Sequence, residues 1–390
     1  MPGARPTISD VARHAGVSKA TVSAVLNASG AVKDATRDRV LAAIELLNYR
    51  PTQPAGRAAR RHRSIAVLIK EHDNPYYAEV VAGVRAHAEG QGYTLLVVSS
   101  EGEYDVERRA VELLRDKDVD GLIVTPVFDE HADLSHFFEL KRRNFPLVLL
   151  EQIRGLRSSL VDVDNVEASR GAVEHLIALG HARVAHLAGP DYSMHSRERV
   201  DGVRRAYSGT RHIFTDDAIV PTGAHLADGY RAGLALFGGG EGGGARPAAD
   251  RPTAVTCYND LVAVGLLRAL AELGLRVPHD VSVVGFDDLP LCEYLPVPLT
   301  TVQVPKFRMG ESAAQLLVRH IESRQAVAPQ KISLTATLVV RGSTAAPPAV
   351  AAPQSMPPAL GLSVSAVSVE RLDARLDARN PNAAPATRGA

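Results

Sequence analysis

The chain has 390 residues, of which 45% are hydrophobic, and its formal net charge at pH 7 is zero. This length predicts two or three domains, with enough apolar residues for cores of ordinary size. The only two cysteines, Cys257 and Cys292, exclude a disulfide framework and a multi-cysteine zinc site, and we expect no metal and no cofactor. No signal-peptide core and no run of about 18 apolar residues occurs, which predicts a soluble cytoplasmic protein without a membrane partner.

The zero net charge hides an asymmetry. Residues 1–63 contain 11 Lys and Arg but only 4 Asp and Glu, so this segment carries +7 and the remainder carries −7. A basic N-terminal module on an acidic body indicates a partner that bears phosphates, although a solvated basic surface would have the same charge.

Three short helices are predicted in this basic segment. Thr7 and Asp10 have the spacing of a capping box at the start of the first, Ser18 can cap the second after Gly16, and the third covers residues 34–47. Short helices with a glycine turn between the first two predict a helix-turn-helix. The apolar residues that share one face are Val17, Val22, Val25 and Leu26 on the second helix, and Val40, Leu41, Ile44 and Leu47 on the third.

The opposite face of the second helix carries one lysine, small hydroxyls, an amide and alanines: Lys19, Ala20, Ser23, Ala24 and Asn27. In the major groove of DNA a lysine can donate to guanine, alanine methyls can pack on thymine methyls, and hydroxyls can reach phosphates. A helix packed against another domain would be more apolar or more charged on this face. The pattern therefore predicts a recognition helix for double-stranded DNA.

Residues 64–343 have an α/β pattern. The β-rich segments are SIAVLI, YTLLVVSS, DGLIVTPV, FPLVLLEQ, ARVAHLAG, TAVTCYND and DVSVVGFDD, and helical periodicity follows most of them. The alternation predicts two lobes, each with a doubly wound parallel sheet. We expect four regions: a helix-turn-helix domain (1–48), a linker that can form a helix (49–63), the two-lobed core (64–343) and a disordered Ala/Pro-rich tail (344–390).

In doubly wound sheets, ligands bind beyond the carboxyl ends of the strands. Aromatic faces, carboxylates, amides and arginines follow these ends, a combination that suits a small polyol. Helix capping or loop structure is the simpler interpretation for Asp260 and Asp288, and a lone His195 is also ordinary. The side chains at these ends are Asp73, Asn74, Tyr76, Tyr77, Glu151, His195, Arg197, Arg199, Asn259, Asp260, Asp287 and Asp288.

The lac repressor family (LacI/GalR) has a DNA-binding headpiece that is similar to TISDVARHAGVSKATVSAVLNASGAVKDATRDRVLAAIELLNYRP. Its ligand-binding core resembles, in the same order, DNPYYAEVVAGV, VDGLIV, VDVDN, LIALGHARVAHLAGP, RERVDGV, CYNDLVAVGLLRALAELGLRVPHDVSVVGFDD and PLTTVQVPKF. The resemblance covers residues 7–343. It implies an all-α headpiece, a core of the periplasmic-binding-protein-like type I, and a homodimer (with a higher oligomer left open) that binds a pseudo-palindromic operator under the control of a small effector.

The resemblance also implies roles for individual residues. Base reading falls to Lys19, Ala20 and Ala24, and phosphate contacts fall to Thr7, Ser18, Thr21, Ser23 and Asn27. In the linker, Ala58 stands where many members have a leucine that wedges into the minor groove, and a methyl group is a poor wedge. Either the DNA is kinked less or the contact is mainly electrostatic, through Arg57, Arg60, Arg61 and Arg63, and we favour the second. Effector contacts fall to Tyr76, Tyr77, Arg199, Asn259 and Asp287, with Glu151 and His195 as further candidates.

The sequence also bears on several alternative functions. The sequence has no nucleophile elbow, HExxH motif or dinucleotide fingerprint, so we expect neither an enzyme nor catalytic residues. The aromatic that often stacks on the ligand from the second lobe is replaced by Ala224, beside His225. A sugar-like effector is favoured, while a purine or a small carboxylate stays open. It also stays open whether the effector is an inducer or a corepressor, and whether the protein is a repressor or an activator. The main alternative is a DNA-binding regulator whose core binds no effector and serves only dimerisation or protein binding.

Overall fold

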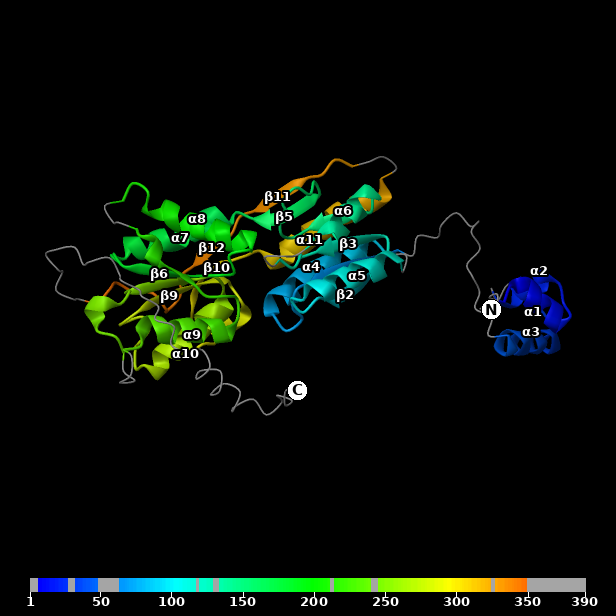
Figure 1. Cartoon of the computed structure of the whole chain (residues 1–390), viewed down its shortest axis with the longest axis horizontal. Coiled ribbons are helices and arrows are strands. Elements are labelled where there is room, and N and C mark those ends of the chain that lie inside the picture. Colours follow the sequence, from blue (N-terminus) through cyan, green and yellow to red (C-terminus); the bar gives the residue numbers. More distant parts are fainter. Residues whose placement is uncertain are drawn as a thin grey trace, which may run out of the picture. The chain divides into compact units, whose positions relative to one another are not determined.

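The computed structural model describes residues 6–26, 32–47, 63–116, 119–128, 133–210, 214–239, 245–323 and 327–348. The chain divides into two compact units, Met1–Arg61 and His62–Ala390, which are described separately (Figure 1). The predicted contacts of Asn27, Arg57, Ala58, Arg60 and Arg61 with DNA, and the tail beyond residue 348, lie outside the described residues.

The first unit contains three helices, α1 (Ile8–Ala15), α2 (Lys19–Leu26) and α3 (Asp34–Leu46). The expected capping box is present, since the Thr7 amide and hydroxyl both donate to Asp10 Oδ2, at 2.9 and 2.6 Å. Gly16 ends α1 at φ +64°, a left-handed conformation that favours glycine. Ser18 Oγ accepts the Thr21 amide proton at 3.0 Å, which confirms Ser18 as the cap of α2.

A small apolar core joins the three helices. Val11, Val22 and Val40 are completely buried in it. The expected inward face of α2 is confirmed, because Val17, Val25 and Leu26 pack against this core. The expected stripe of α3 is wrong at Leu41, which is 49% exposed, and the smaller Ala43 is buried instead. The remaining members of the cluster are Ala12, Ala15, Ile8, Ile44 and Leu47.

The second unit is built on two six-stranded sheets, one for each lobe. The strand order is β11-β5-β4-β3-β1-β2 in the first lobe and β12-β10-β9-β8-β6-β7 in the second. Among the described residues, these strands pair in parallel except for β10 with β12. The first-lobe strands are β1 (Ser64–Ile69), β2 (Thr94–Ser99), β3 (Gly121–Val124), β4 (Leu147–Leu149), β5 (Ser159–Val163) and β11 (Lys331–Leu334). The second-lobe strands are β6 (Val184–Ala188), β7 (Ile219–Pro221), β8 (Ala254–Cys257), β9 (Ser282–Asp287), β10 (Thr300–Gln303) and β12 (Thr337–Val339).

Helices cover both faces of each sheet, as expected for a doubly wound fold. In the first lobe α4 (Pro75–Gly90) and α11 (Lys306–Glu322) pack on one face, and α5 (Tyr104–Asp116) and α6 (Ser135–Arg142) pack on the other. In the second lobe α7 (Asn165–Ala178) and α8 (Met194–Tyr207) lie opposite α9 (Leu226–Phe237) and α10 (Asp260–Glu272) (Figure 1). Short 3-10 helices are η1 (Asp216–Ala218), η2 (Ala248–Asp250) and η3 (Pro290–Glu293).

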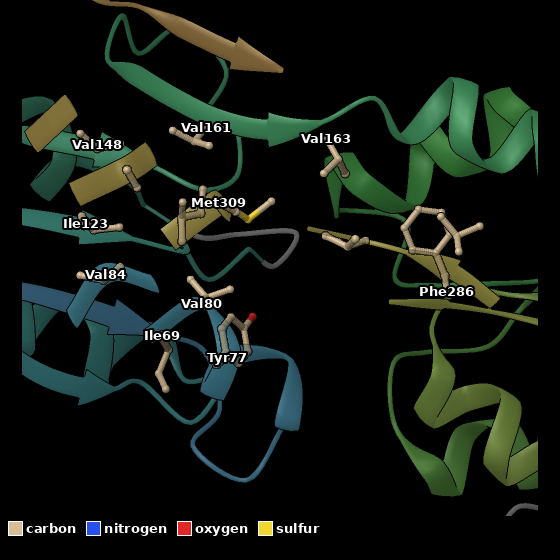
Figure 2. Packing of buried hydrophobic residues seen from close by; sticks show 14 of the residues in the cluster. Ile69, Tyr77, Val80, Val84, Ile123, Val148, Val161, Val163, Phe286 and Met309 are labelled. Atoms are coloured by element: carbon tan, nitrogen blue, oxygen red, sulfur yellow. The ribbon is translucent and has the colours of Figure 1, made fainter. Parts of the chain in front are cut away.

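The chain crosses between the lobes three times, from β5 to α7, from β10 to α11 and from β11 to β12. One apolar cluster continues through these crossovers. Figure 2 shows Tyr77, Val80 and Met309 on the first-lobe side of the cluster and Phe286 on the second-lobe side, with Val163 near the crossover. The lobes are therefore joined by packed side chains as well as by the connecting segments.

All seven β-rich segments that the sequence indicated contain strands, whereas β5, β7, β10, β11 and β12 were not predicted. The chain also stays bound to the second lobe past the expected boundary at Ser343, because His181 and Ser282 both contact the carbonyl oxygen of Ala345. Both cysteines are buried free thiols. Among the described residues, no helix is long and apolar enough to span a membrane.

Candidate DNA-binding surface and effector site

The outward face of α2 has the expected composition. Lys19 and Ala20 are exposed, and Ser23 and Ala24 are partly exposed. Ser18 and Thr21 share a hydrogen bond of 2.9 Å between their hydroxyls, and both lie at the start of the helix. A helix N-terminus with free hydroxyl capacity favours phosphate contacts there, while Lys19 and the alanines remain available to base edges.

The linker residue Arg63 differs from the expectation. Its Nε donates to the Gly92 carbonyl at 3.1 Å, and its guanidinium lies 4.8 Å from the centre of the Tyr93 ring. Arg63 therefore binds the first lobe of the core, and it is not a free charge for a DNA contact.

A cavity of about 220 Å³ lies between the two lobes, at the carboxyl ends of β1, β3, β4, β6, β8 and β9. All seven residues expected to contact an effector line it: Tyr76, Tyr77, Glu151, His195, Arg199, Asn259 and Asp287. The structure thus brings together side chains that are more than 200 positions apart in the sequence. The other lining residues are Lys70, Glu71, Asn74, Gly102, Thr125, Val127, Phe128, Leu150, Pro190, Tyr192, Ser193, Ala224, His225 and Tyr258.

A buried charge network forms one wall of the cavity. Lys70 Nζ donates to Glu151 Oε2 at 2.7 Å, and Ser193 Oγ donates to Glu151 Oε1 at 3.0 Å. His195 lies between two carboxylates, with Nε2 3.1 Å from Asp162 Oδ1 and Nδ1 3.9 Å from Glu151 Oε2. Opposite charges alternate along this wall, so each charge is compensated by a neighbour.

The network shifts the pKa values of its members. Burial alone would raise the pKa of Glu151, but the charges of Lys70 and then His195 outweigh it and lower that pKa to about 2. Burial alone would lower the pKa of His195, but the carboxylates of Glu151 and Asp162 raise it. Glu151 is therefore ionised at neutral pH, and His195 titrates at a higher pH than an ordinary histidine.

Arg199 of α8 is held deep in the cavity by three residues, Asn165, Tyr258 and Phe286. Its Nε donates to Asn165 Oδ1 at 3.1 Å, and its Nη1 donates to the Tyr258 carbonyl. Its guanidinium carbon lies 3.6 Å from the ring centre of Phe286 and 4.7 Å from that of Tyr258. Nη2 lies 4.0 Å from Asp287 Oδ1, beyond hydrogen-bond distance, so this guanidinium edge and the carboxylate can each bind a ligand group between them.

Among the carboxyl groups that line the cavity, Asp287 has the largest shift in pKa. Burial raises its pKa to about 7, although the charge of Arg199 acts in the opposite direction. Its backbone has a φ of 114° and that of Asp288 has a φ of 55°, so the end of β9 is strained. Lys306 stabilises this conformation, because its Nζ donates to the carbonyl oxygens of Asp287 (2.5 Å) and Asp288 (3.0 Å).

Tyr76 and Tyr77 form a T-shaped pair with ring centres 5.3 Å apart, and the Tyr76 hydroxyl donates to Met309 Sδ. Asn259 is more constrained than the sequence indicated. Its Oδ1 accepts the Val262 amide proton at the start of α10, and its Nδ2 donates to the Ala224 carbonyl, both at 2.8 Å. The second proton of Nδ2 and the second lone pair of Oδ1 are left for a ligand.

Two of the strand-end residues have the structural role that we preferred for them. Asp260 accepts hydrogen bonds from the Leu289 amide and the Thr301 hydroxyl, and Asp288 pairs with Arg341 at 2.7 Å. In contrast, the second lobe does supply aromatic side chains to the cavity, Tyr192 and Tyr258, although Ala224 replaces the aromatic expected there.

Sequence reasoning missed Lys70, Thr125, Phe128 and Tyr258. Each follows a strand within four residues, so the rule of strand carboxyl ends could have found all of them. Among the described residues, no group of three or more His, Cys, Asp or Glu side chains could hold a metal ion.

Comparison with known proteins agrees with this geometry. Residues 7–52 match the family of bacterial regulatory proteins of the lacI type, and residues 173–344 match the periplasmic binding protein-like domain. The fold and the matches define a class of DNA-binding regulatory proteins, in which a helix-turn-helix domain is joined to a two-lobed core.

The HTH-type transcriptional repressor PurR of Vibrio vulnificus (strain CMCP6) is 34% identical over 332 residues, which cover 82% of this chain and 93% of that relative. Among solved structures, the transcriptional regulator CelR in complex with cellobiose has a TM-score of 0.64 at 30% identity and covers 87% of this chain and all of its own. The lac repressor dimer bound to operator and the anti-inducer ONPF has a TM-score of 0.63 at 29% identity, over 88% of this chain and 100% of that one. The chain belongs to the lacI family of bacterial regulatory proteins.

Proposed function

We propose that this protein is a cytoplasmic transcriptional repressor that binds a pseudo-palindromic operator as a homodimer, with a DNA affinity controlled by a small sugar-like effector. The observation that carries the proposal is the cavity between the lobes, in which all seven expected effector residues meet. A ligand that contacts both walls changes the balance between lobe arrangements, and this change alters how the two headpieces are held.

The chemistry of the cavity supports a polyol. The Asp287 carboxylate and the Arg199 guanidinium offer acceptors and donors 4.0 Å apart, and Tyr76 and Tyr258 supply aromatic surface. A sugar hydroxyl is both a donor and an acceptor, so it can bridge such a pair. The CelR structure contains cellobiose, which makes a carbohydrate the first class to test.

Dimerisation is supported by the edge of the first sheet. Strand β2 lies at the end of this sheet, and it exposes Leu96 (37%) and Val97 (46%). An exposed apolar edge strand is a surface that proteins usually cover. We propose that a second copy covers it.

The proposal is tested by a thermal-shift screen of the full-length protein against sugars, polyols, nucleobases and small carboxylates. A ligand at a hundredfold excess over its Kd stabilises the native state by about 2.7 kcal/mol. We expect a sugar to raise Tm in the wild type but not in Asp287→Ala or Arg199→Ala. A nucleobase or carboxylate hit with the same dependence would change the effector class, and a flat screen in a protein that still binds DNA would favour a core without an effector.

A further inference from the structure

A second hollow, of about 500 Å³, adjoins the cavity between the lobes. Phe128 and Tyr192 line both spaces, so the two adjoin at these side chains. We call this second hollow the aromatic groove and define it by Phe128, Phe138, Gln152, Arg154, Tyr192 and Arg197.

The aromatic groove has the surface chemistry of a carbohydrate subsite. Phe138 is 43% exposed and Tyr192 is 38% exposed, which is unusual for large aromatic side chains. The negative face of an aromatic ring attracts the C–H face of a pyranose. Arg154 is exposed, and its guanidinium makes no hydrogen bond or ion pair with the described residues, so its donors are available to hydroxyl groups.

The segments that carry Phe128 and Phe138 are held in place by a buried carboxylate, that of Glu107. Glu107, which is completely buried, accepts the Val127 amide proton at 2.6 Å, and its Oε1 lies 3.2 Å from His136 Nε2. Val127 precedes Phe128, and His136 lies on α6 two positions before Phe138. One carboxylate therefore fixes the backbone beside one aromatic and the helix that carries the other, and such preorganisation favours binding.

The volumes of the cavity and of the aromatic groove indicate how a ligand would be distributed between them. The cavity of about 220 Å³ lies below the range of about 300–1,000 Å³ that is usual for ligand sites, so it suits one small ring. The aromatic groove is larger, and it combines residues of the first lobe with Met194 and Arg197 of α8 in the second lobe. A ligand that fills both spaces is elongated and contacts both lobes.

We propose that the effector is a carbohydrate of at least two linked units, with one unit in the cavity and the next in the aromatic groove. This proposal rests on the proposed function, since it assigns a ligand to the same cleft. It differs from a monosaccharide effector in one measurable respect: the second unit must add affinity through residues that do not line the cavity, such as Phe138 and Arg154.

Isothermal titration calorimetry of the full-length protein tests this. The probes are glucose, galactose, cellobiose, maltose, lactose and cellotriose. We expect at least one di- or trisaccharide to bind about tenfold more tightly than its component monosaccharides, a gain of about 1.4 kcal/mol. Phe138→Ala and Arg154→Ala should each remove most of this gain without changing monosaccharide affinity. Leu113→Ala, at a 57% exposed site on α5, is the control and should change neither.

The outcomes separate the two proposals. Monosaccharide binding that depends on Asp287, without any gain from a second unit, overturns the aromatic groove but leaves the proposed function intact. Equal losses for mono- and disaccharide in the Phe138 and Arg154 variants also overturn it. If none of these carbohydrates binds the wild type, both proposals for the effector fall together.

Discussion

Nζ of Lys70 donates to Oε2 of Glu151 across a distance of 2.7 Å. The two residues follow the ends of β1 and β4, the strands on either side of β3. The Glu151 side chain is 1% exposed, whereas that of Lys70 is 23% exposed. The carboxylate therefore depends on its protein neighbours for compensation, because little water reaches it. This pair, extended by His195 and Asp162, makes the cleft wall a charged structure that must be complete to be stable.

Removal of one partner should destabilise the fold. We expect Lys70→Met to lower the free energy of unfolding by about 3 kcal/mol, because Glu151 loses its main cation. Glu151→Gln in the same chain should restore most of the loss. The measurement is urea denaturation at pH 7, and the control is Arg170→Met at the exposed pair with Glu167, where the loss should stay below about 1 kcal/mol. Equal losses at both sites would contradict this account of the wall.

The same network predicts sensitivity to acid. The pKa of Glu151 is about 2 in the fold and has its ordinary value of 4.5 in the unfolded chain, so its contribution to stability is present above pH 4.5 and is lost as the pH falls toward 2. We expect the wild type to lose more stability over this interval than the double variant Lys70→Met/Glu151→Gln. Parallel curves of Tm against pH for the two proteins would refute the assignment.

Effector binding should depend on pH through Asp287. Its pKa is about 7, so the carboxylate that accepts ligand hydroxyl protons forms as the pH rises through 7. We expect the affinity for the effector to increase about tenfold between pH 6 and pH 8. Because protonation is favoured in the folded state, the stability of the ligand-free protein should fall over the same interval.

The control for this prediction is Asp287→Asn, which should abolish both changes. Arg199, Asp260, Lys306 and His195 also influence this carboxyl, and the carboxylates of Glu151 and Asp162 raise the pKa of His195 itself despite its burial. A pH dependence that disappears in His195→Gln but persists in Asp287→Asn would transfer the effect to the histidine.

Specificity for DNA should depend on Lys19. Two of the three expected base-reading positions are alanines, so we expect Lys19, which is exposed on α2, to make the polar base contact. Lys19→Ala should relax specificity at one guanine of each half-site by about 1–3 kcal/mol. Selection of operator sequences from random duplexes measures this, and an unchanged motif in the variant would exclude Lys19 as a reader.

The close contact between α4 and α11 should leave no room for a methyl group on Gly310. A Cβ on Gly310 would lie 1.9 Å from the Val80 carbonyl oxygen, so Gly310→Ala must separate the helices that position Tyr76 and Tyr77. We expect a loss of about 3 kcal/mol in stability. Gly90→Ala is the matched control, because nothing lies within 4 Å of a Cβ at that end of α4, and it should be neutral or slightly stabilising. Thermal denaturation of both variants distinguishes them.

The sequence predicted the sheets well where strands are buried. SIAVLI matches β1 residue for residue, since a continuous apolar run between polar segments is typical of a parallel strand with both faces covered. Strands at the edges and crossovers escaped prediction. The outermost strand β11 alternates polar and apolar residues over only four positions and β12 is only three residues long, and their pairing comes from the tertiary crossover.

The candidate site was predictable in its position but not in its couplings. The rule of strand carboxyl ends located Glu151, Arg199 and Asp287, because their place depends only on topology. The pairing of Lys70 with Glu151, the aromatic contacts of Arg199 and the role of Asn259 as a helix cap depend on side-chain directions across lobes. No local pattern encodes those directions. Leu41 illustrates the same limit, since helical periodicity placed it inward and the packing of α3 leaves it exposed.

We propose that the cleft and the DNA-binding surface are coupled, and thermodynamic linkage tests this coupling. With a duplex obtained by selection and a carbohydrate obtained from the thermal-shift screen, one measures the Kd for DNA with and without carbohydrate, and the Kd for carbohydrate with and without DNA. We predict that both ratios differ from one by the same factor, about 5–150-fold, and that Arg199→Ala brings both to one. A carbohydrate that binds the cleft while the affinity for DNA stays unchanged would contradict the claim.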